Sequence, residues 1–195
     1  MATRRTPEGL ETLQDFVNTL DREEEKDEVG TPATLARWLV DRGLLPAAES
    51  ELGEGDHARA IELREALRRM ALANNGEAPS PGATATVERH AGEARLEARF
   101  PADGGWRLEP GAGGIAGSLG RLIAIMVEAM ADGTWSRVKA CSAGSCQWAF
   151  YDTSKNRSAH WCSMRVCGNR AKARQFRARR RTRVPGPVTT PSVDP

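Results

Sequence analysis

Residues Trp135 to Arg181 read WSRVKACSAGSCQWAFYDTSKNRSAHWCSMRVCGNRAKARQFRARRR and contain every cysteine of the 195-residue chain. The thiols form two pairs of C-x4-C spacing, separated by fifteen residues: Cys141 and Cys146, then Cys162 and Cys167. Paired thiols at short spacing are typical ligands of one tetrahedral Zn2+, with Zn–S distances of about 2.3 Å. The spacing therefore predicts one structural zinc ion held by these four residues.

Two disulfides would also use four cysteines, as they do in many secreted domains. The first twenty residues, MATRRTPEGLETLQDFVNTL, contain no apolar stretch of the kind that a signal peptide needs. We therefore expect a cytoplasmic protein, where paired cysteines are more often metal ligands. Four thiolates leave no open coordination position, so the zinc would stabilise the fold and would not activate water. His160 could replace one thiolate, although a surface position beside the site fits it better.

The cysteine window also predicts a local fold. Cys141 and Cys146 can form a knuckle whose short loop lets backbone N–H groups approach the thiolates. Residues 147–151 read as an apolar strand leaving the knuckle, and residues 152–156 read as a turn in which Asp152 pairs locally or caps. Cys167 would then open the last helix, near its positive N-terminal end. Knuckle, hairpin and helix together predict a treble-clef-like zinc finger.

Eight Lys and Arg residues without an acid follow the last cysteine. On a helix they would lie on both sides, and buried arginines need partners, so such a helix cannot pack fully against its own domain. The pattern predicts a polyanion partner, with DNA ahead of RNA, although a solubilising tail would show the same charge. With two residues of the preceding loop, the candidate phosphate-binding residues are Lys155, Arg157, Arg170, Lys172, Arg174, Arg177, Arg179, Arg180, Arg181 and Arg183.

The charge divides the chain into two parts. Residues 1–136 carry 15 basic and 24 acidic residues, whereas residues 137–183 carry 13 basic residues and a single acid. This asymmetry favours an acidic domain over residues 1–132, a basic zinc domain over 133–183, and a disordered tail over 184–195. The most apolar run, residues 119–130, is short and contains two charges, so we expect no membrane span. No motif sets the oligomeric state.

The first 75 residues predict three helices. Proline at the first helical position loses no needed N–H, so Thr6–Pro7 and Thr31–Pro32 mark two helix starts. Gly43 ends the second helix, and residues 23–28 between the first two form a solvated loop. A third helix is expected over residues 56–74. The first helix has an apolar face at helical spacing, formed by Leu10, Leu13, Val17 and Leu20.

The hydrophobic period changes after residue 83. Apolar residues alternate with charged ones over residues 94–100, which predicts a half-buried strand, flanked by strands over 84–90 and 106–109 in a small antiparallel meander. Residues 115–131 return to helical spacing and read as a core helix. We therefore predict the α+β class, with a mainly helical N-terminal domain that contains a small antiparallel sheet, followed by the zinc finger and its basic helix.

The C-terminal stretch closely resembles the CGNR zinc-finger family, whose motif stands here as Cys167-Gly168-Asn169-Arg170. The paired cysteines and the sequence segments 152–157 and 161–164 also resemble this family. The N-terminal part resembles the ABATE domain that accompanies this finger in bacterial stress-induced transcription regulators, through residues 15–20 and through the segment from Thr31-Pro32 to Gly43-Leu44-Leu45. The resemblance implies DNA-binding transcription regulation in a stress response.

Three roles are open for the acidic domain. It could sense a small-molecule effector, with Asn18, Thr19 and Trp38 as candidate pocket residues, although Asn18 could equally satisfy backbone groups and Trp38 could be core. It could instead mask the basic helix by charge, in which case deletion of residues 1–132 would tighten DNA binding. An enzyme is not expected, because no histidine lies in a nucleophile, metal or cofactor motif. Zinc loss on thiolate oxidation would be a further switch.

Overall fold

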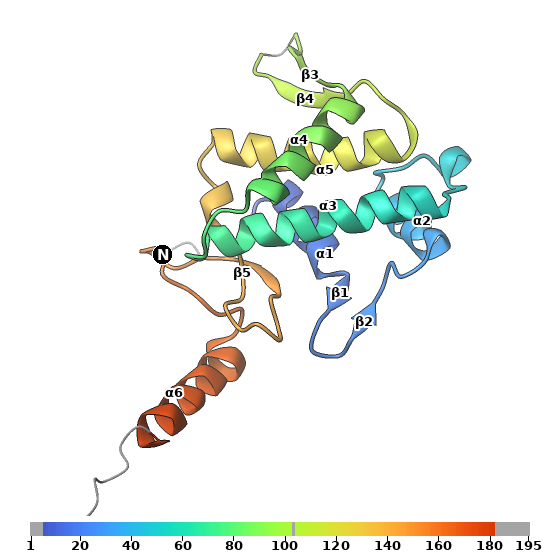
Figure 1. Cartoon of the computed structure of the whole chain (residues 1–195). Coiled ribbons are helices and arrows are strands. Elements are labelled where there is room, and N and C mark those ends of the chain that lie inside the picture. The colour runs from blue at the N-terminus through green and yellow to red at the C-terminus, as the bar shows by residue number, and fades with distance from the viewer. Residues whose placement is uncertain (1–5, 103, 182–195) are drawn as a thin grey trace, which may run out of the picture. The chain divides into compact units, whose positions relative to one another are not determined.

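A computed structural model describes residues 6–102 and 104–181 of the chain. The chain divides into two compact units, Met1–Cys162 and Ser163–Pro195. The fold is α+β, as predicted: helices dominate, and the strands form three separate antiparallel hairpins (Figure 1).

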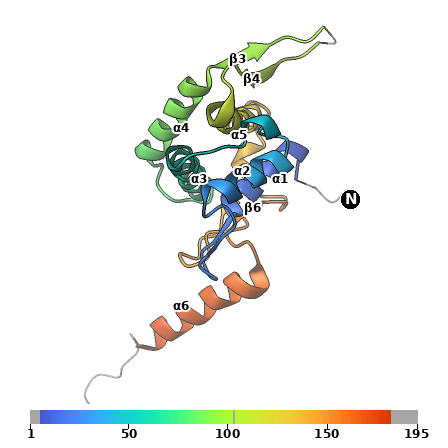
Figure 2. The ribbon, with the colours of Figure 1, turned by 90° about the vertical axis from the view of Figure 1, so that its right-hand side faces the viewer.

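The described residues of the first unit form five α-helices: α1 (Glu8–Asn18), α2 (Pro32–Asp41), α3 (Glu54–Ala73), α4 (Pro81–Ala94) and α5 (Gly114–Ala131). Short 3-10 turns lie at Ala47–Glu49 and Trp135–Arg137. The long helices α3 and α5 pack with α1 and α4 around one core, which Figures 1 and 2 show from two sides. The predicted apolar stripes of the first helix and of α5 supply fully buried residues such as Leu13, Leu119 and Leu122.

The start of α2 follows the predicted capping signal, whereas α1 begins at Glu8, one residue later than predicted, with Pro7 as its N-cap and no side-chain cap. Thr31 closes a capping box with Thr34, and Pro32 occupies the first turn of α2. The helix ends before Gly43, whose φ of +65° lies in the left-handed region that glycine adopts without cost. The predicted bounds of α1, α3 and α5 agree with the structure to within about two residues, the usual uncertainty of helix ends.

The predicted strand over residues 84–90 is wrong, because this segment belongs to α4. Ser80 accepts a hydrogen bond from the backbone N–H of Ala83, and Pro81 occupies the first helical turn. This is the same start signal that marks α2, and it outweighs the alternating threonines. The side chains that α4 buries recur at helical spacing: Ala83, Val87, His90 and Ala94.

Three two-stranded antiparallel hairpins complete the first unit. They pair β1 (Leu20–Asp21) with β2 (Lys26–Asp27), β3 (Leu96–Arg99) with β4 (Arg107–Pro110), and β5 (Val138–Ala140) with β6 (Ala149–Tyr151). The segment expected as a loop over residues 23–28 is therefore partly a hairpin. The expected meander is reduced to the β3–β4 pair, and its strand is not half-buried, because Ala98 and Arg99 are exposed and Phe100 beyond them is 77% exposed.

Helix α5 anchors the base of the β3–β4 hairpin. Gly120 lies against this base, where a Cβ atom would fall 2.5 Å from the Cβ of Ala94 and 3.1 Å from that of Pro110, so only glycine permits the approach. With 18 residues, α5 is long and apolar enough to cross a membrane, which the sequence did not predict. More than half of it is buried inside the protein, as in a core helix of a globular domain.

The second unit contains a π-helical turn at Met164–Gly168 and the helix α6 (Asn169–Arg181). Ser163 begins the turn by accepting a hydrogen bond from the backbone N–H of Val166. Cys167 lies in this turn, directly before α6, close to the predicted helix start. Arg183 and the tail over residues 184–195 lie outside the described residues, and only the backbone of Arg180 and Arg181 is described.

Candidate metal centre and basic helix

The first cysteine pair lies at the tip of the β5–β6 hairpin. The backbone N–H of Cys141 donates to the carbonyl of Trp148 at 2.9 Å, and the N–H of Cys146 donates to the carbonyl of Ala143 at 2.8 Å. These bonds close the predicted knuckle between the two strands. The strand that follows the knuckle is confirmed as β6, whereas its partner β5, which precedes the knuckle, was not predicted.

The four cysteines come together in one cluster. The sulfur atoms of Cys141, Cys146, Cys162 and Cys167 all lie within 4.8 Å of one another. A tetrahedral zinc site with Zn–S distances of about 2.3 Å places its sulfur atoms about 3.8 Å apart. The separation of 3.6 Å between the sulfurs of Cys146 and Cys162 is close to that value. The cluster therefore fits the predicted zinc ion with four thiolate ligands, and no disulfide joins these cysteines.

The surroundings of Cys141 favour its thiolate form. A hydrogen bond from the Cys146 thiol lowers the pKa of Cys141 to about 5, and backbone N–H groups of Ala143 and Cys162 act in the same direction against the effect of burial. The same contact and burial raise the pKa of Cys146. The approach of the Ala143 N–H to a thiolate agrees with the predicted role of the short knuckle loop. Metal binding requires thiolates, so Cys141 favours a cation, whereas Cys146 has to release its proton when a cation binds.

Asn75, which follows the C-terminal end of α3, forms hydrogen bonds with the residues around the knuckle. The side-chain amide of Asn75 donates to the carbonyl of Ala140 at 2.7 Å, and to the Ser142 hydroxyl and the His160 carbonyl at 3.0 Å each. Its Oδ1 lies 2.9 Å from Nδ1 of His160. Asn75 is buried and contacts the residue after Cys141 and a residue two positions before Cys162. Its side chain thus links the chain segments of two cysteines.

His160 is not among the four residues whose ligand atoms cluster, and its Nδ1 lies within hydrogen-bond distance of Asn75. Asn74 adds a parallel contact, because its amide donates to the carbonyls of Trp135 and Val138 at 2.9 Å each. The sequence predicted a helix that ends at residue 74 and gave Asn75 no role in the finger. The signal that was available is the pair of adjacent asparagines, which can satisfy several backbone groups at once.

A buried arginine and an asparagine connect α1 and α3 to the same hairpin. Arg68 donates to the carbonyl of Val17 at 2.6 Å and to the carbonyl of Gln147 at 3.0 Å. Burial lowers its pKa, while the neighbouring Glu65 acts in the opposite direction. Asn18 accepts from the N–H of Ala149 at 2.7 Å and donates to its carbonyl at 2.9 Å, which extends the β6 edge by one amide. Residues 137–162 are thus built onto the helical core.

The loop after β6 is fixed by a buried ion pair. The Lys139 ammonium lies 2.8 Å from the carboxylate of Asp152, and both side chains are at most 4% exposed. Burial raises the pKa of Asp152, but hydrogen bonds from Lys139 and Ser154 outweigh it and leave the pKa at about 2. The carboxylate also accepts from the backbone N–H of Ser154 and Ala159. Asp152 therefore both pairs locally and caps the turn, as predicted.

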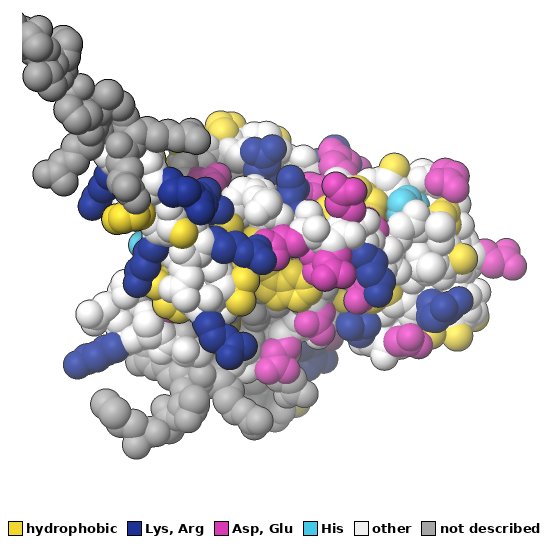
Figure 3. Space-filling view, turned by 90° about the horizontal axis from the view of Figure 1, so that it is seen from below, with side chains coloured by type: hydrophobic (Ala, Val, Ile, Leu, Met, Phe, Trp, Pro, Cys, Tyr) yellow, Lys and Arg dark blue, Asp and Glu magenta, His cyan; other side chains and the backbone are white. Residues whose placement is uncertain are grey.

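The predicted phosphate-binding residues lie in two places. Lys155 and Arg157 lie exposed in the loop after β6, and the Arg157 guanidinium donates to the Ser136 hydroxyl at 2.8 Å. On α6 the side chains of Arg170, Lys172, Arg174, Arg177 and Arg179 are exposed, and among the described residues α6 carries no acid. By contrast, acidic and basic side chains are interspersed over part of the face shown in Figure 3. Ion pairs such as Arg59–Glu93 occur in the first unit.

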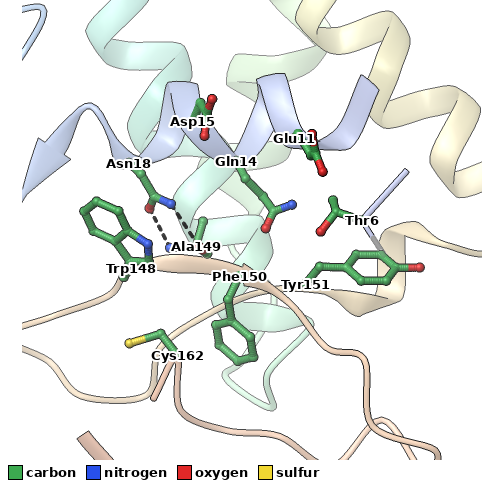
Figure 4. A pocket seen from close by; sticks show the side chains of 10 residues that line it. All are labelled: Thr6, Glu11, Gln14, Asp15, Asn18, Trp148, Ala149, Phe150, Tyr151 and Cys162. Atoms are coloured by element: carbon green, nitrogen blue, oxygen red, sulfur yellow. Dashed lines mark hydrogen bonds between the residues drawn. The ribbon is translucent and has the colours of Figure 1, made fainter. Parts of the chain in front are cut away.

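The three candidate effector residues are not brought into one cavity. Trp38 is core, with its ring 5.5 Å from that of Phe16 and the Arg42 guanidinium over its face. Thr19 is buried and bonds to the Phe16 carbonyl and to Arg64. Only Asn18 lines a groove of about 400 Å³ between α1 and β6 (Figure 4). The other residues of the groove are Thr6, Glu11, Gln14, Asp15, Trp148, Ala149, Phe150, Tyr151 and Cys162.

Two family models match the chain. The model of the CGNR zinc finger matches residues 137–180. The model of ABATE, described as a putative stress-induced transcription regulator, matches residues 11–133, which is more than half of the chain. The chain belongs to the ABATE family. Both resemblances noted in the sequence are thereby confirmed. No curated protein matches the chain.

The boundary between the ABATE domain and the CGNR finger does not coincide with the division into compact units. The ABATE match ends at residue 133, whereas the first compact unit continues to Cys162 and includes the β5–β6 hairpin. The contacts of Asn18, Arg68 and Asn75 explain this continuity, because each joins an ABATE helix to the finger.

Proposed function

We propose that this ABATE protein is a zinc-dependent, DNA-binding transcription regulator of the bacterial cytoplasm, active in a stress response. The observation that carries the proposal is the helix α6, whose described basic side chains are exposed and which begins two residues after the last cysteine of the cluster. Zinc would fix the start of α6, and its basic side chains would contact phosphates, which dominate DNA affinity. The family description as a transcription regulator supports the same role.

We propose a binding role and not catalysis for this chain, and the positions of the three histidines agree with that proposal. His57 Nε2 lies 2.7 Å from the Val29 carbonyl, and His160 bonds to Asn75. His90 is buried between α3 and α4. In the proposal the ABATE domain either senses an effector or interacts with another molecule. The groove at Asn18 offers a site for a small-molecule effector. None of the three histidines lines that groove.

An RNA- or ribosome-associated zinc protein is the competing function, because a basic helix also binds A-form RNA. Selection of bound duplexes from a random DNA pool tests the proposal, with the zinc content measured on the same sample. We expect about one zinc per chain and enrichment of a short sequence. Competition of the selected duplex against structured RNA at fixed salt separates the two functions. Preference for RNA, or DNA binding that persists after zinc removal, would contradict the proposal.

A further inference from the structure

The β3–β4 hairpin projects from the helices of the first unit in both Figure 1 and Figure 2. Its two faces differ sharply. Side chains alternate along a strand, so one face carries only apolar residues and the other only charged ones. Antiparallel register pairs Leu96 with Pro110 and Ala98 with Leu108 on the apolar face. The next pair in this register is Phe100 and Trp106, which are 77% and 48% exposed.

The outer edge of β4 is already occupied. The backbone N–H of Leu108 donates to the carboxylate of Glu128 on α5 at 2.9 Å, so it points away from β3. In an antiparallel ladder, a residue whose N–H points outward belongs to a non-hydrogen-bonded pair. Leu108 and its partner Ala98 are therefore such a pair. Pro110, which has no N–H to donate, is opposite Leu96 in another.

This alternation fixes the free edge of β3. The backbone groups of Leu96, Ala98 and Phe100 point away from β4, and no other described strand pairs with β3. Edge strands in natural proteins are usually protected by proline, by bulges or by a covering segment. Within Leu96–Arg99 there is no proline, and its Ala98 and Arg99 are exposed. The edge is thus open to another strand.

We propose that β3 pairs antiparallel with β3 of a second copy of this chain, with Ala98 on the twofold axis, to form a dimer. In this register Leu96 is opposite Phe100 of the partner copy, and all outward groups of the three residues find partners. Glu97 is opposite Arg99 of the partner copy, and Arg99 is opposite its Glu97, so the charges are complementary in both places. Twofold dimers with one self-complementary surface are the commonest soluble oligomers.

The charges within one hairpin favour this arrangement further. Glu97 faces Glu109 and Arg99 faces Arg107 across the β3–β4 ladder, so directly opposed residues carry like charges. Arg99 compensates by pairing with Glu97 at 2.7 Å and with Glu109 at 3.7 Å. A second β3 strand would supply an oppositely charged neighbour directly opposite each of Glu97 and Arg99. The resulting four-stranded sheet would also widen the apolar face around Phe100.

Sedimentation equilibrium of the zinc-loaded full chain, from about 1 μM to about 1 mM, tests the dimer over the range that small interfaces span. We expect the mean mass to rise with concentration from 21.2 kDa toward twice that value. Glu97→Arg places arginine opposite arginine at both positions and should raise the dimer Kd at least about tenfold. Glu109→Arg makes the same charge change on the inner strand and should leave the Kd within about twofold.

Mixing two variants gives the decisive result. In Glu97→Arg both residues 97 and 99 are basic, and in Arg99→Glu both are acidic. Each variant alone would therefore place like charges opposite each other and should be monomeric. Together they restore two opposite-charge pairs, so an equimolar mixture should dimerise about as strongly as the wild type. Ala98→Pro, which removes an outward N–H and no β3–β4 bond, should also abolish the dimer. A wild type that stays monomeric, a dimer that tolerates Glu97→Arg, or a mixture that stays monomeric would each overturn the proposal.

Discussion

Asn75 illustrates how a single amide can support a metal site that it does not touch. Its side chain contacts three acceptors around the knuckle, together with the ring of His160. Loss of the side chain would remove its hydrogen bond to the Ala140 carbonyl, and buried groups that lose a partner are costly. Residues that orient metal-binding segments are typically worth a factor of 10 to about 100 in metal affinity.

We therefore predict that Asn75→Ala weakens zinc binding about tenfold or more. Competition with a chromophoric chelator measures the affinity in the full-length protein. Asn156→Ala, an exposed asparagine of the same finger, is the matched control and should leave the affinity unchanged. Equal zinc affinity of Asn75→Ala and the wild type would show that the contacts of Asn75 do not support the cluster.

His90 makes the stability of the ABATE domain depend on pH. It is 1% exposed, neither ring nitrogen has a hydrogen-bond partner, and Glu93 and Glu62 lie 3.4 and 3.7 Å away. Burial lowers the pKa of His90, with Arg89 acting in the same direction and the two carboxylates against it. The unfolded chain therefore binds a proton more readily than the fold does, and stability falls as the pH drops below about 6.5.

Replacement of His90 by leucine should remove this contribution. We expect the difference in the free energy of unfolding between His90→Leu and the wild type to grow in favour of the variant from pH 7.5 to pH 5.5, by up to about 1.4 kcal/mol per pH unit, and the difference in Tm to grow in the same direction. Thermal unfolding at matched zinc concentration measures it, since effects of pH on the thiolates are common to both proteins. A difference that does not change with pH would contradict a buried neutral His90.

At the scale of elements, the sequence predicted best where a local chemical signal was strong. The four-cysteine cluster and the Thr31–Pro32 helix start were predicted because thiol spacing and capping are local. Helix α4 was missed because residues 84–90 were expected as a strand beside residues 94–100, and the start signal at Ser80–Pro81 was not used. The contacts of Asn75 with the finger join residues more than sixty positions apart, and no local pattern reports such distances.

Helix α6 should act as an electrostatic element with additive contributions. Each phosphate contact contributes about 0.9 to the slope of log K against log salt. Arg174→Gln with Arg177→Gln should therefore reduce the magnitude of the slope by about 2 and weaken binding to all duplexes similarly. Arg37→Gln with Arg69→Gln removes the same charge from exposed sites on α2 and α3 and should change neither. An equal loss in both double variants would point to net charge alone.

At the scale of the whole molecule, the finger depends on the ABATE core. Val138, Ala140 and Ala149 of the β5–β6 hairpin are buried against that core, and Asn18, Arg68, Asn74 and Asn75 bond to the finger. Deletion of residues 1–132 would remove these partners, so it cannot test charge masking without disturbing the fold. Masking is better tested by neutralising surface acids in the full chain.

The same dependence predicts the behaviour of an isolated finger. A fragment of residues 133–195 should bind zinc at least about tenfold more weakly than the full chain, because it lacks the residues that orient the knuckle. Chelator competition on the two proteins measures the ratio. Amide signals of the fragment should also be poorly dispersed. A fragment that matches the zinc affinity of the full chain would show that the finger is autonomous.

The central claim is that zinc presents α6 to the phosphates of DNA. The most direct measurement is fluorescence anisotropy of a selected duplex with the zinc-loaded full chain, between about 50 and 300 mM salt. Contact with ~5–8 phosphates predicts a slope of log K against log salt of about −5 to −7, together with loss of binding when zinc is chelated. A slope near zero, or an unchanged slope after zinc removal, would contradict the claim.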